Sequence, residues 1–283
     1  MAVPRHARAS SSRSVKPLPT DPCDRQKKAA LATGSPFFLP ASTAQRIANP
    51  LVCRLKGAMP LRRIKHALTR MLSPYKIEVY DLLREAAARQ SADYAAQHLD
   101  QAMIFRLREE LWDYAASHAQ LESGMMLEFG VFEGVSINHL AKRFPGERLY
   151  GFDSFTGLAE DWTGYHLPKG AFDLGGNLPK VSSNVALIKG WFEDTVPSFL
   201  AEHPDAPVRL CHLDCDTYAS ARYVLETIAP RLTTGSVIIF DEYYGYPNWQ
   251  QGEFRAWQEV CKLAGLKYRY LAFANMQAAV IIE

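Results

Sequence analysis

Short apolar runs that alternate with helical patterns constrain the fold of this chain more than any other feature. From residue 125 onward there are seven such runs: MMLEFG, RLYGFD, VALIKG, VRLCHLD, SVIIFD, KYRYLAFA and AAVIIE. Strands that alternate with helices indicate a parallel sheet covered by helices on both faces. We therefore expect an α/β fold with a doubly wound, mostly parallel, seven-stranded sheet in residues 121–283.

The segment before these runs has a helical composition. Residues 77–119 contain no glycine or proline and are rich in Ala, Leu, Glu, Arg and Gln, which predicts two or more helices, the last one over IFRLREELWDYAASHA. Upstream, LRRIKHALTRML has apolar residues at helical spacing and basic residues on its other face. We interpret residues 61–120 as a helical cap. The alternative for its basic helix is peripheral binding to an anionic membrane.

The N-terminal region differs from the rest in charge. Residues 1–77 hold 15 Lys and Arg against 2 Asp and Glu, whereas residues 78–283 hold 17 against 28. Residues 1–60 lack periodicity and are interpreted as a flexible basic tail. An organelle transit peptide is the alternative, although Asp21, Asp24 and the early prolines argue against it. No nucleic-acid-binding module accompanies the basic charge, so no nucleic-acid partner is expected.

Cysteine content and hydropathy indicate the compartment. The five cysteines are an odd number without CxxC spacing, which favours reduced thiols over disulfides or a zinc site. No apolar run approaches the roughly 20 residues that cross a bilayer, and the N-terminus lacks the apolar core of a secretory signal. We expect a cytoplasmic protein.

Polar residues and glycines close five consecutive runs of the predicted sheet. In doubly wound sheets, ligands bind beyond the carboxyl ends of the strands, near the point where the strand order reverses. The residues at these ends are therefore the candidates for a binding site. They are Glu128 and Gly130, Asp153, Gly190, Asp214 and Asp216, and Asp241 and Glu242.

The first strand end carries a glycine turn. LEFGVFEGVS places Gly130 and Gly134 between a strand and a helix, where missing side chains let a ligand approach the backbone and the helix N-terminus. A purely structural turn is the alternative. Asp153 follows about twenty residues later, where an acidic residue accepts both hydroxyls of a ribose. Its alternative role is to cap the turn DSFTG.

The later strand ends bring carboxylates together. Asp214 closes the fourth run, and Asp241 and Glu242 close the fifth. Neighbouring parallel strands place such residues at one point, and clustered carboxylates repel one another unless a cation lies among them. Ligands that offer only oxygen suit Mg²⁺ or Ca²⁺ rather than zinc.

Several motifs in this order resemble the class I S-adenosylmethionine-dependent methyltransferases, particularly the macrocin (TylF-like) O-methyltransferases with their Rossmann-like fold. The resemblance runs from Leu127 to Glu259 through LEFGVFEGVS, LYGFDSFTGL, KGWFEDTVP, HLDCDTY and IIFDEYYGYPNW. It implies S-adenosyl-L-methionine as the cofactor and a turn that holds the cofactor's methionine portion, with Ser136 near its carboxylate and Asp153 on the ribose. The full implied set of cofactor-binding residues is Glu128, Gly130, Gly134, Ser136, Asp153, Trp191 and Phe192. Core packing is the alternative for the two aromatic residues.

The resemblance also implies a metal site. In metal-dependent relatives, the positions that match Asp214, Asp241 and Glu242 hold Mg²⁺, which lowers the pKa of the acceptor oxygen and orients it. The family's usual residue at the last position is Asp or Asn, so Glu242 departs from the pattern. We name Asp214, Asp216 and His166 as catalytic candidates, His166 as a base if its loop closes over the site.

Together these features predict a Mg²⁺-assisted O-methyltransferase that modifies a hydroxyl of a small molecule, either a sugar moiety or a phenol. We also expect a homo-oligomer. One alternative is a metal-dependent glycosyltransferase whose DCD motif grips a nucleotide sugar. Another is a non-catalytic scaffold that kept a methyltransferase-like fold. The loop YYGYPNW is expected either to stack on an acceptor or to pack on the cap helices.

Overall fold

The computed structural model describes residues 78–283. The predicted basic tail, the basic helix in residues 61–72 and any membrane contact through them lie outside the described residues. The described residues, 78–283, belong to one compact unit.

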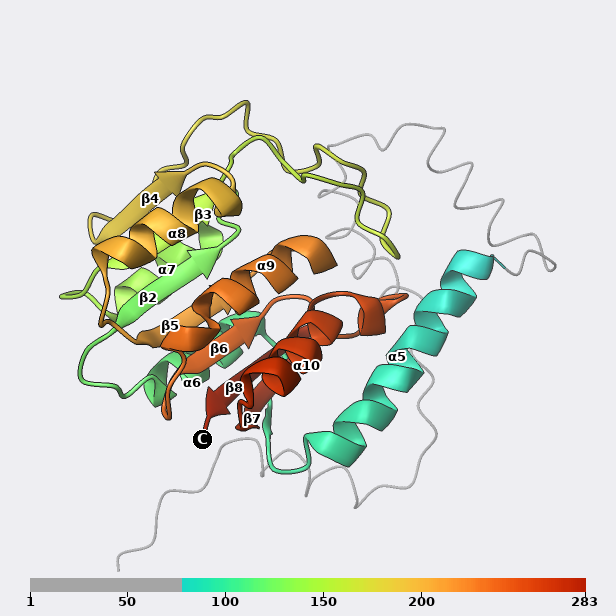
Figure 1. The fold of residues 1–283 in the computed structure, drawn as a ribbon. Coiled ribbons are helices and arrows are strands. Elements are labelled where there is room, and N and C mark those ends of the chain that lie inside the picture. The colour runs from blue at the N-terminus through green and yellow to red at the C-terminus, as the bar shows by residue number, and fades with distance from the viewer. Residues whose placement is uncertain (1–77) are drawn as a thin grey trace, which may run out of the picture. The chain divides into compact units, whose positions relative to one another are not determined.

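An eight-stranded sheet forms the centre of this unit (Figure 1), in the strand order β1-β7-β8-β6-β5-β2-β3-β4. The strands are β1 (Met103–Ile104), β2 (Met125–Phe129), β3 (Leu149–Asp153), β4 (Val185–Lys189), β5 (Val208–Leu213), β6 (Val237–Phe240), β7 (Tyr268–Ala274) and β8 (Gln277–Ile282). Strands β4, β3, β2, β5 and β6 run parallel, and β8 pairs antiparallel with both β6 and β7. The expected α/β class and the mostly parallel sheet are confirmed.

The sheet has one strand more than the sequence predicts. All seven apolar runs form strands, and β1 adds an eighth by pairing parallel with β7 at the sheet edge. The last cap helix, predicted from residue 104, begins at Arg108 instead. The reason is a tertiary pairing: Ile104 lies in register with Phe273, and the amide of Phe105 donates to the Phe273 carbonyl at 3.0 Å.

Helices cover both faces of the sheet. They are α5 (Val79–His98), α6 (Arg108–His118), α7 (Val135–Arg143), α8 (Phe192–Glu202), α9 (Tyr218–Ile228) and α10 (Glu253–Ala264), with short 3-10 turns η1 (Ala229–Arg231) and η2 (Trp249–Gln251). Helices α6 and α7 pack together on one face, and α8, α9 and α10 pack side by side on the other (Figure 1). Within residues 78–283, none of the helices combines the length and the apolar character that crossing a bilayer requires.

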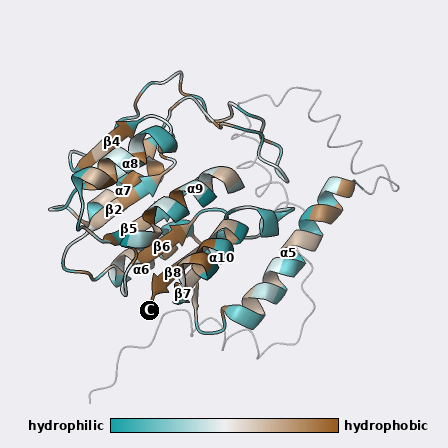
Figure 2. Ribbon diagram, viewed as in Figure 1, coloured by the Kyte–Doolittle hydropathy of each residue, from teal (hydrophilic) through white to brown (hydrophobic). Residues whose placement is uncertain are grey.

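One apolar core lies on each side of the sheet. Trp112 of α6 and Ile137 of α7 belong to one core, while Phe240 of β6 and Trp257 of α10 belong to the other. The strands contribute to both, which explains why they appear as continuous apolar runs and are mainly brown in Figure 2. Because α6 buries Trp112 in the sheet core, this part of the predicted cap is a layer of the sheet domain.

Helix α5 is attached differently. Its buried Ser91 accepts a hydrogen bond from the Gly245 amide at 2.9 Å, in the loop after β6. Its Tyr94 hydroxyl lies 2.6 Å from the Tyr270 hydroxyl of β7. Helix α5 thus contacts the loop that follows β6 and the outer strands of the sheet.

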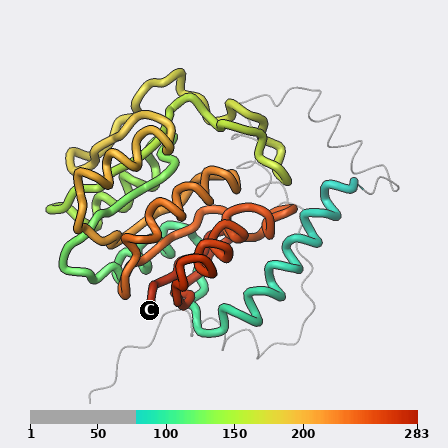
Figure 3. Tube along the Cα trace, viewed as in Figure 1, coloured from blue at the N-terminus to red at the C-terminus, as the bar shows by residue number. Residues whose placement is uncertain are grey.

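The strand order creates a switch point between β2 and β5. From β2 the chain proceeds outward through β3 to β4, then returns to β5 on the other side of β2 and proceeds to β6. The loops after β2 and β5 consequently diverge at their carboxyl ends, where a crevice opens. The long loop between β3 and β4, residues 154–184, extends away from the sheet at this edge (Figure 3).

Gly151 of β3 tests how tightly α7 and the switch-point turn pack on the sheet. A Cβ at this position would lie 2.6 Å from Ile137 Cδ1 and 2.8 Å from Val131 Cγ2. We expect Gly151→Ala to lower the free energy of unfolding by about 1–3 kcal/mol because the core must expand. Urea unfolding measures the change. Gly146→Ala, where a Cβ meets nothing within 4 Å, is the matched control, and equal stability of the two variants would contradict this packing.

Candidate functional site

A cavity of about 350 Å³ opens at the carboxyl ends of the central strands. Its walls come from the ends of β2 to β6 and from the loop between β3 and β4. Most of the residues named from the sequence line it. They are Gly130, Asp153, Gly190, Trp191, Phe192, Asp214, Asp216, Asp241 and Glu242.

Four of the named residues do not line the cavity. Glu128 is buried beneath the turn, where its carboxylate accepts a hydrogen bond from Ser136 Oγ at 2.9 Å and lies 3.0 Å from His212 Nδ1. Gly134 lies at the far end of the turn, as the residue before α7. His166 is exposed and its ring lies 4.8 Å from that of Tyr165. Glu128, Ser136 and His166 therefore do not face the cavity in this conformation.

The turn after β2 is held in an unusual backbone conformation. Gly130 has φ +88°, and a Cβ there would lie 1.7 Å from the carbonyl oxygen of Asp214, so only glycine fits. Phe132 has φ +44°, which is rare for a bulky residue and is typical of ligand-binding segments. The amides of Val131 and Phe132 both donate to Asp153 Oδ2 at 2.8 Å, so this carboxylate fixes the turn.

Asp153 also caps its own turn, as the structural alternative predicts. The Phe155 amide donates to Asp153 Oδ1 at 2.7 Å. Each carboxylate oxygen offers more than one acceptor site, and the side chain still lines the cavity. The arrangement leaves the carboxylate accessible to a ligand while it orders two turns.

Aromatic side chains form one wall of the cavity. Trp191 is 43% exposed in front of α8, and Phe192 packs edge-on against Phe129 with ring centroids 5.6 Å apart. In the loop between β3 and β4, Trp162 stacks on Tyr165 with ring centroids 4.4 Å apart. Trp162, Tyr165, Trp191 and Phe192 all line the cavity, which gives a planar ligand faces to stack on.

The aromatic loop after β6 lies behind the cavity lining, where Tyr246 packs edge-on against Trp162 and Tyr165 of this wall. Its four large residues are buried, and none of them lines the cavity. They are Tyr243, Tyr244, Tyr246 and Trp249. Trp249 packs against Tyr94 of α5 at 5.6 Å, as the packing interpretation of YYGYPNW predicts, and the stacking interpretation stays a prediction.

Carboxylates form a second wall of the cavity. Two groups of side chains bring their potential ligand atoms within 4.8 Å of one another: Asp214, Asp216 and Glu242 form one group, and His212, Asp214 and Asp241 form the other. The trio predicted for the metal, Asp214 with Asp241 and Glu242, is thus divided between the two groups. The longer side chain of Glu242 reaches Asp216 and Asp214, whereas Asp241 turns toward His212.

Burial and mutual repulsion govern the charges in this wall. Burial, followed by the charge of Asp241, raises the pKa of Asp214 and of Glu242 well above their usual values. The same two causes raise the pKa of Asp216 to about 7. Asp216 also has φ +58°, a left-handed conformation that aspartate tolerates better than most residues. The carboxyls therefore bind protons near neutral pH unless a cation replaces those protons.

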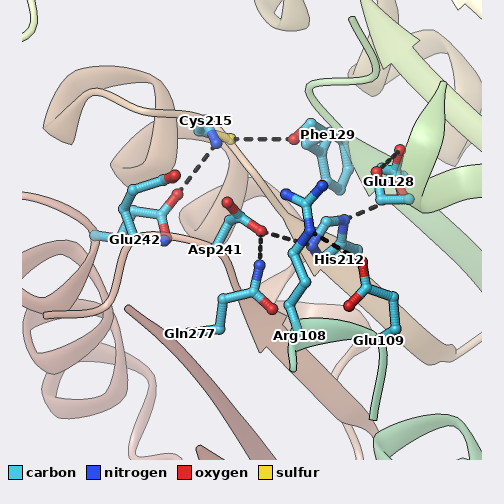
Figure 4. Close-up of polar contacts among 11 residues, drawn as sticks. Arg108, Glu109, Glu128, Phe129, His212, Cys215, Asp241, Glu242 and Gln277 are labelled. Atoms are coloured by element: carbon cyan, nitrogen blue, oxygen red, sulfur yellow. Dashed lines mark hydrogen bonds and ion pairs between the residues drawn. The ribbon is translucent and has the colours of Figure 1, made fainter. Parts of the chain in front are cut away.

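His212 connects this wall to the glycine turn (Figure 4). The fully buried imidazole lies between Glu128 and Asp241, with Nε2 3.5 Å from Asp241 Oδ1. Burial opposes its charge, but the hydrogen bonds and charges of Asp241 and Glu128 raise the pKa of His212 well above its usual value. Burial likewise opposes the charge of Asp241, but His212 lowers the pKa of that carboxyl below its usual value.

Two contributors were missed from the sequence. Glu253, the first residue of α10, is completely buried and accepts hydrogen bonds from the amides of Cys215 and Glu242 at 3.1 and 3.2 Å. Arg108, the first residue of α6, lines the cavity. Neither carries a recognisable motif, because a single charged residue at a helix start is typical of solvent-exposed helices.

Glu253 gives the site a measurable pH dependence. Burial raises its pKa to about 8, from an ordinary value of 4.5. Between these values the folded protein holds a proton that the unfolded chain has lost, so stability decreases as pH rises. We expect Glu253→Gln to flatten this slope in metal-free protein, measured by urea unfolding from pH 5 to 8. The exposed Glu226→Gln is the control. Asp214, Asp216 and Glu242 also have raised pKa values, so a shallower slope should remain in Glu253→Gln, and a slope as steep as that of the wild type would contradict the assignment.

Comparison with known proteins identifies the domain. Residues 127–243 match a family model described as a methyltransferase domain. A segment of 63 residues, 22% of this chain, is 35% identical to the 8-demethyl-8-(2,3-dimethoxy-alpha-L-rhamnosyl)-tetracenomycin-C 4'-O-methyltransferase of Streptomyces olivaceus. This match spans 23% of that relative's length.

A solved structure supports the same assignment over a longer span. The calicheamicin methyltransferase CalS11 is 25% identical and superposes with a TM-score of 0.51, covering 78% of this chain and 91% of its own. The matched domain begins in β2 and ends just after β6, so it contains the glycine turn, Asp153 and the carboxylate wall. This favours methyl transfer over the nucleotide-sugar alternative for the DCD motif. Residues 127–243 are thus a match to a methyltransferase domain, in a chain whose fold resembles that of the methyltransferase CalS11.

Proposed function

We propose that this protein is an S-adenosylmethionine-dependent O-methyltransferase that methylates a hydroxyl of a small molecule, either a sugar moiety or a phenol. The observation that carries the proposal is a single cavity that joins the strained glycine turn and aromatic wall to a cluster of buried carboxylates. The tetracenomycin relative is named as a 4'-O-methyltransferase of a rhamnosyl compound, which supports a glycosylated acceptor and the resemblance to the macrocin enzymes. A homo-oligomer and a cytoplasmic location stay predictions from the sequence.

The residues present fit the cofactor. Gly130 lines the cavity, where its missing side chain makes room for the carbonyl oxygen of Asp214, and Asp153 presents a carboxylate to the same cavity. Trp191 and Phe192 provide apolar faces for an adenine ring. Glu128, Gly134 and Ser136 act through the turn: the Ser136–Glu128–His212 hydrogen bonds hold it from beneath.

The residues also fit a divalent cation. Oε2 of Glu242 is buried without a hydrogen-bond partner, and Asp214 and Asp216 lie close enough to share a ligand with it. This set offers only oxygen, which suits Mg²⁺. The group that contains His212 is less suitable, because a metal-binding histidine must be neutral whereas Glu128 and Asp241 favour its protonated form. When bound, Mg²⁺ lowers the pKa of an acceptor hydroxyl.

Asp216 is the proposed general base. It lines the cavity, and its pKa of about 7 matches the pH at which a base is most effective. Asp214 orients the acceptor as a cation ligand in the same wall. His166 lies outside the cavity, so its predicted role as a base requires a movement of the loop in residues 154–184.

The first test is the titration of purified protein with S-adenosylmethionine, with Mg²⁺ and with chelator, followed by methyl transfer to a panel of glycosides and phenols. We expect cofactor binding under both conditions and Mg²⁺-dependent turnover. Mg²⁺ should also raise the thermal midpoint of the cofactor-free protein, because it binds only the folded carboxylate wall. Asp214→Asn should abolish that increase and the turnover while it keeps cofactor binding. Cofactor binding without turnover on any acceptor would favour the scaffold alternative.

Asp216→Asn tests the proposed base, and the effect of Mg²⁺ on the thermal midpoint of this variant shows whether it still binds the cation, because Asp216 also belongs to the cation group. We expect kcat to decrease about 10²- to 10⁴-fold with little change in cofactor affinity, because the amide cannot accept the hydroxyl proton. The wild-type rate should increase with pH as this carboxyl loses its proton, at a pH below 7 when Mg²⁺ is bound because the cation lowers the pKa, and that dependence should be absent from the residual activity of the variant. An unchanged pH profile would contradict the assignment.

A further inference from the structure

Arg108 is a lone cation in an acidic cavity. Among the described residues that line the cavity, it is the single lysine, arginine or histidine. Six carboxyl-bearing residues line the same space: Asp153, Glu193, Asp214, Asp216, Asp241 and Glu242. The cavity as a whole therefore attracts cations and repels anions, except in the neighbourhood of Arg108.

The position of Arg108 is unfavourable for the helix that carries it. It is the first residue of α6, where the positive end of the helix dipole disfavours a cation. Glu109 and Glu110, the next two residues, follow the usual preference for acidic side chains. Local helix energetics therefore do not explain this arginine.

Contacts within the protein orient the guanidinium of Arg108 but leave it accessible to a ligand. It lies over the ring of the buried Trp112, 5.0 Å from the centroid, which limits its freedom. Its contact with the Glu109 carboxylate is 3.5 Å long, and the Arg108 side chain remains 47% exposed. Arg108 and Asp241 line the same cavity (Figure 4), and the charge of Arg108 adds to the larger effect of His212 in lowering the pKa of Asp241.

S-adenosylmethionine carries three charged groups that this cavity must accommodate. Its sulfonium and ammonium groups are cations and suit the carboxylates. Its carboxylate is an anion and would be repelled by them. Ser136, the residue expected near that carboxylate, instead donates its hydroxyl proton to Glu128 and does not line the cavity.

We propose that Arg108 binds the carboxylate of the cofactor's methionine portion. This inference rests on the proposed cofactor. Arginine offers parallel N–H donors that match a carboxylate, and such charge-assisted pairs are stronger than neutral hydrogen bonds. The pair leaves the cofactor's two cationic groups to the acidic walls and requires no contact with the adenosine portion.

The test compares S-adenosylmethionine with decarboxylated S-adenosylmethionine, which lacks only the carboxylate, on wild-type protein and on Arg108→Met. Methionine preserves packing over Trp112 but not the charge. We expect the wild type to bind the complete cofactor about 10- to 100-fold more tightly than the decarboxylated form. Arg108→Met should remove most of this preference by weakening the complete cofactor alone, and Arg108→Lys should restore part of it.

Calorimetry gives the dissociation constants of both ligands for the wild type and for Arg108→Met. Together they give the coupling free energy between Arg108 and the cofactor carboxylate. Arg89→Met, on the exposed surface of α5 and outside the cavity, is the matched control and should keep the wild-type preference. Thermal unfolding of each variant shows whether it is folded. If Arg108→Met weakens both ligands equally, or neither, the inference is overturned. If Arg108→Met weakens neither ligand but raises the KM for the acceptor, Arg108 instead binds an anionic group of the acceptor.

Binding of the two cofactor forms to the wild type distinguishes a failure of the Arg108 role from a failure of the proposed function. If the wild type binds neither form of the cofactor, the proposed function falls and this inference falls with it. If the wild type binds both forms equally well, the cofactor assignment stands and only the role of Arg108 is overturned.

Discussion

The concentration of carboxyl groups at one edge of the sheet is the constraint on which the rest of the site depends. Burial and mutual repulsion raise the pKa values of Asp214, Asp216, Glu242 and Glu253. Such groups are stable only when they are protonated, hydrogen-bonded or neutralised by a cation. The fold uses hydrogen bonds for Glu253, which accepts from two backbone amides. The proposed function assigns cations to the others.

Buried polar contacts connect the two halves of the cavity rigidly. Ser136, Glu128, His212 and Asp241 form a buried series of polar contacts that crosses β2, β5 and β6, three neighbouring strands. Gln277 of β8 continues it by donating to Asp241. The series fixes the turn after β2 relative to the carboxylate wall, so the sites proposed for the methyl donor and the acceptor have a defined separation. Such positioning is the main requirement for an in-line methyl transfer.

Because of this network, Glu128 and Ser136 of the glycine turn contact each other instead of a ligand. Glu128 and Ser136 satisfy each other beneath the backbone, and Asp153 satisfies the amides of Val131 and Phe132 above it. The strained φ of Phe132 is thereby held in place before any ligand binds. With Ser136 occupied, the anionic end of the proposed cofactor requires another partner, and Arg108 from α6 is available for it.

The sequence by itself determined the α/β class, the seven main strands and the carboxyl edge as the location of the site. These features are local: a buried parallel strand is a continuous apolar run, and the polar residues that end it are its neighbours in the chain. The sequence also indicated the packing role of YYGYPNW as one of two alternatives. Only the tertiary structure shows the packing contact, because it depends on α5, far away in the sequence.

The tertiary structure also decided which polar side chains meet. It divided the predicted trio by turning Asp241 to His212 and Glu242 to Asp216, and it brought in Glu253 from the start of α10 and Arg108 from the start of α6. It added β1 through pairing with β7, which overrode the helical pattern at residue 104. Strand order and helix packing set these contacts over long sequence separations, and no local pattern of residues encodes them.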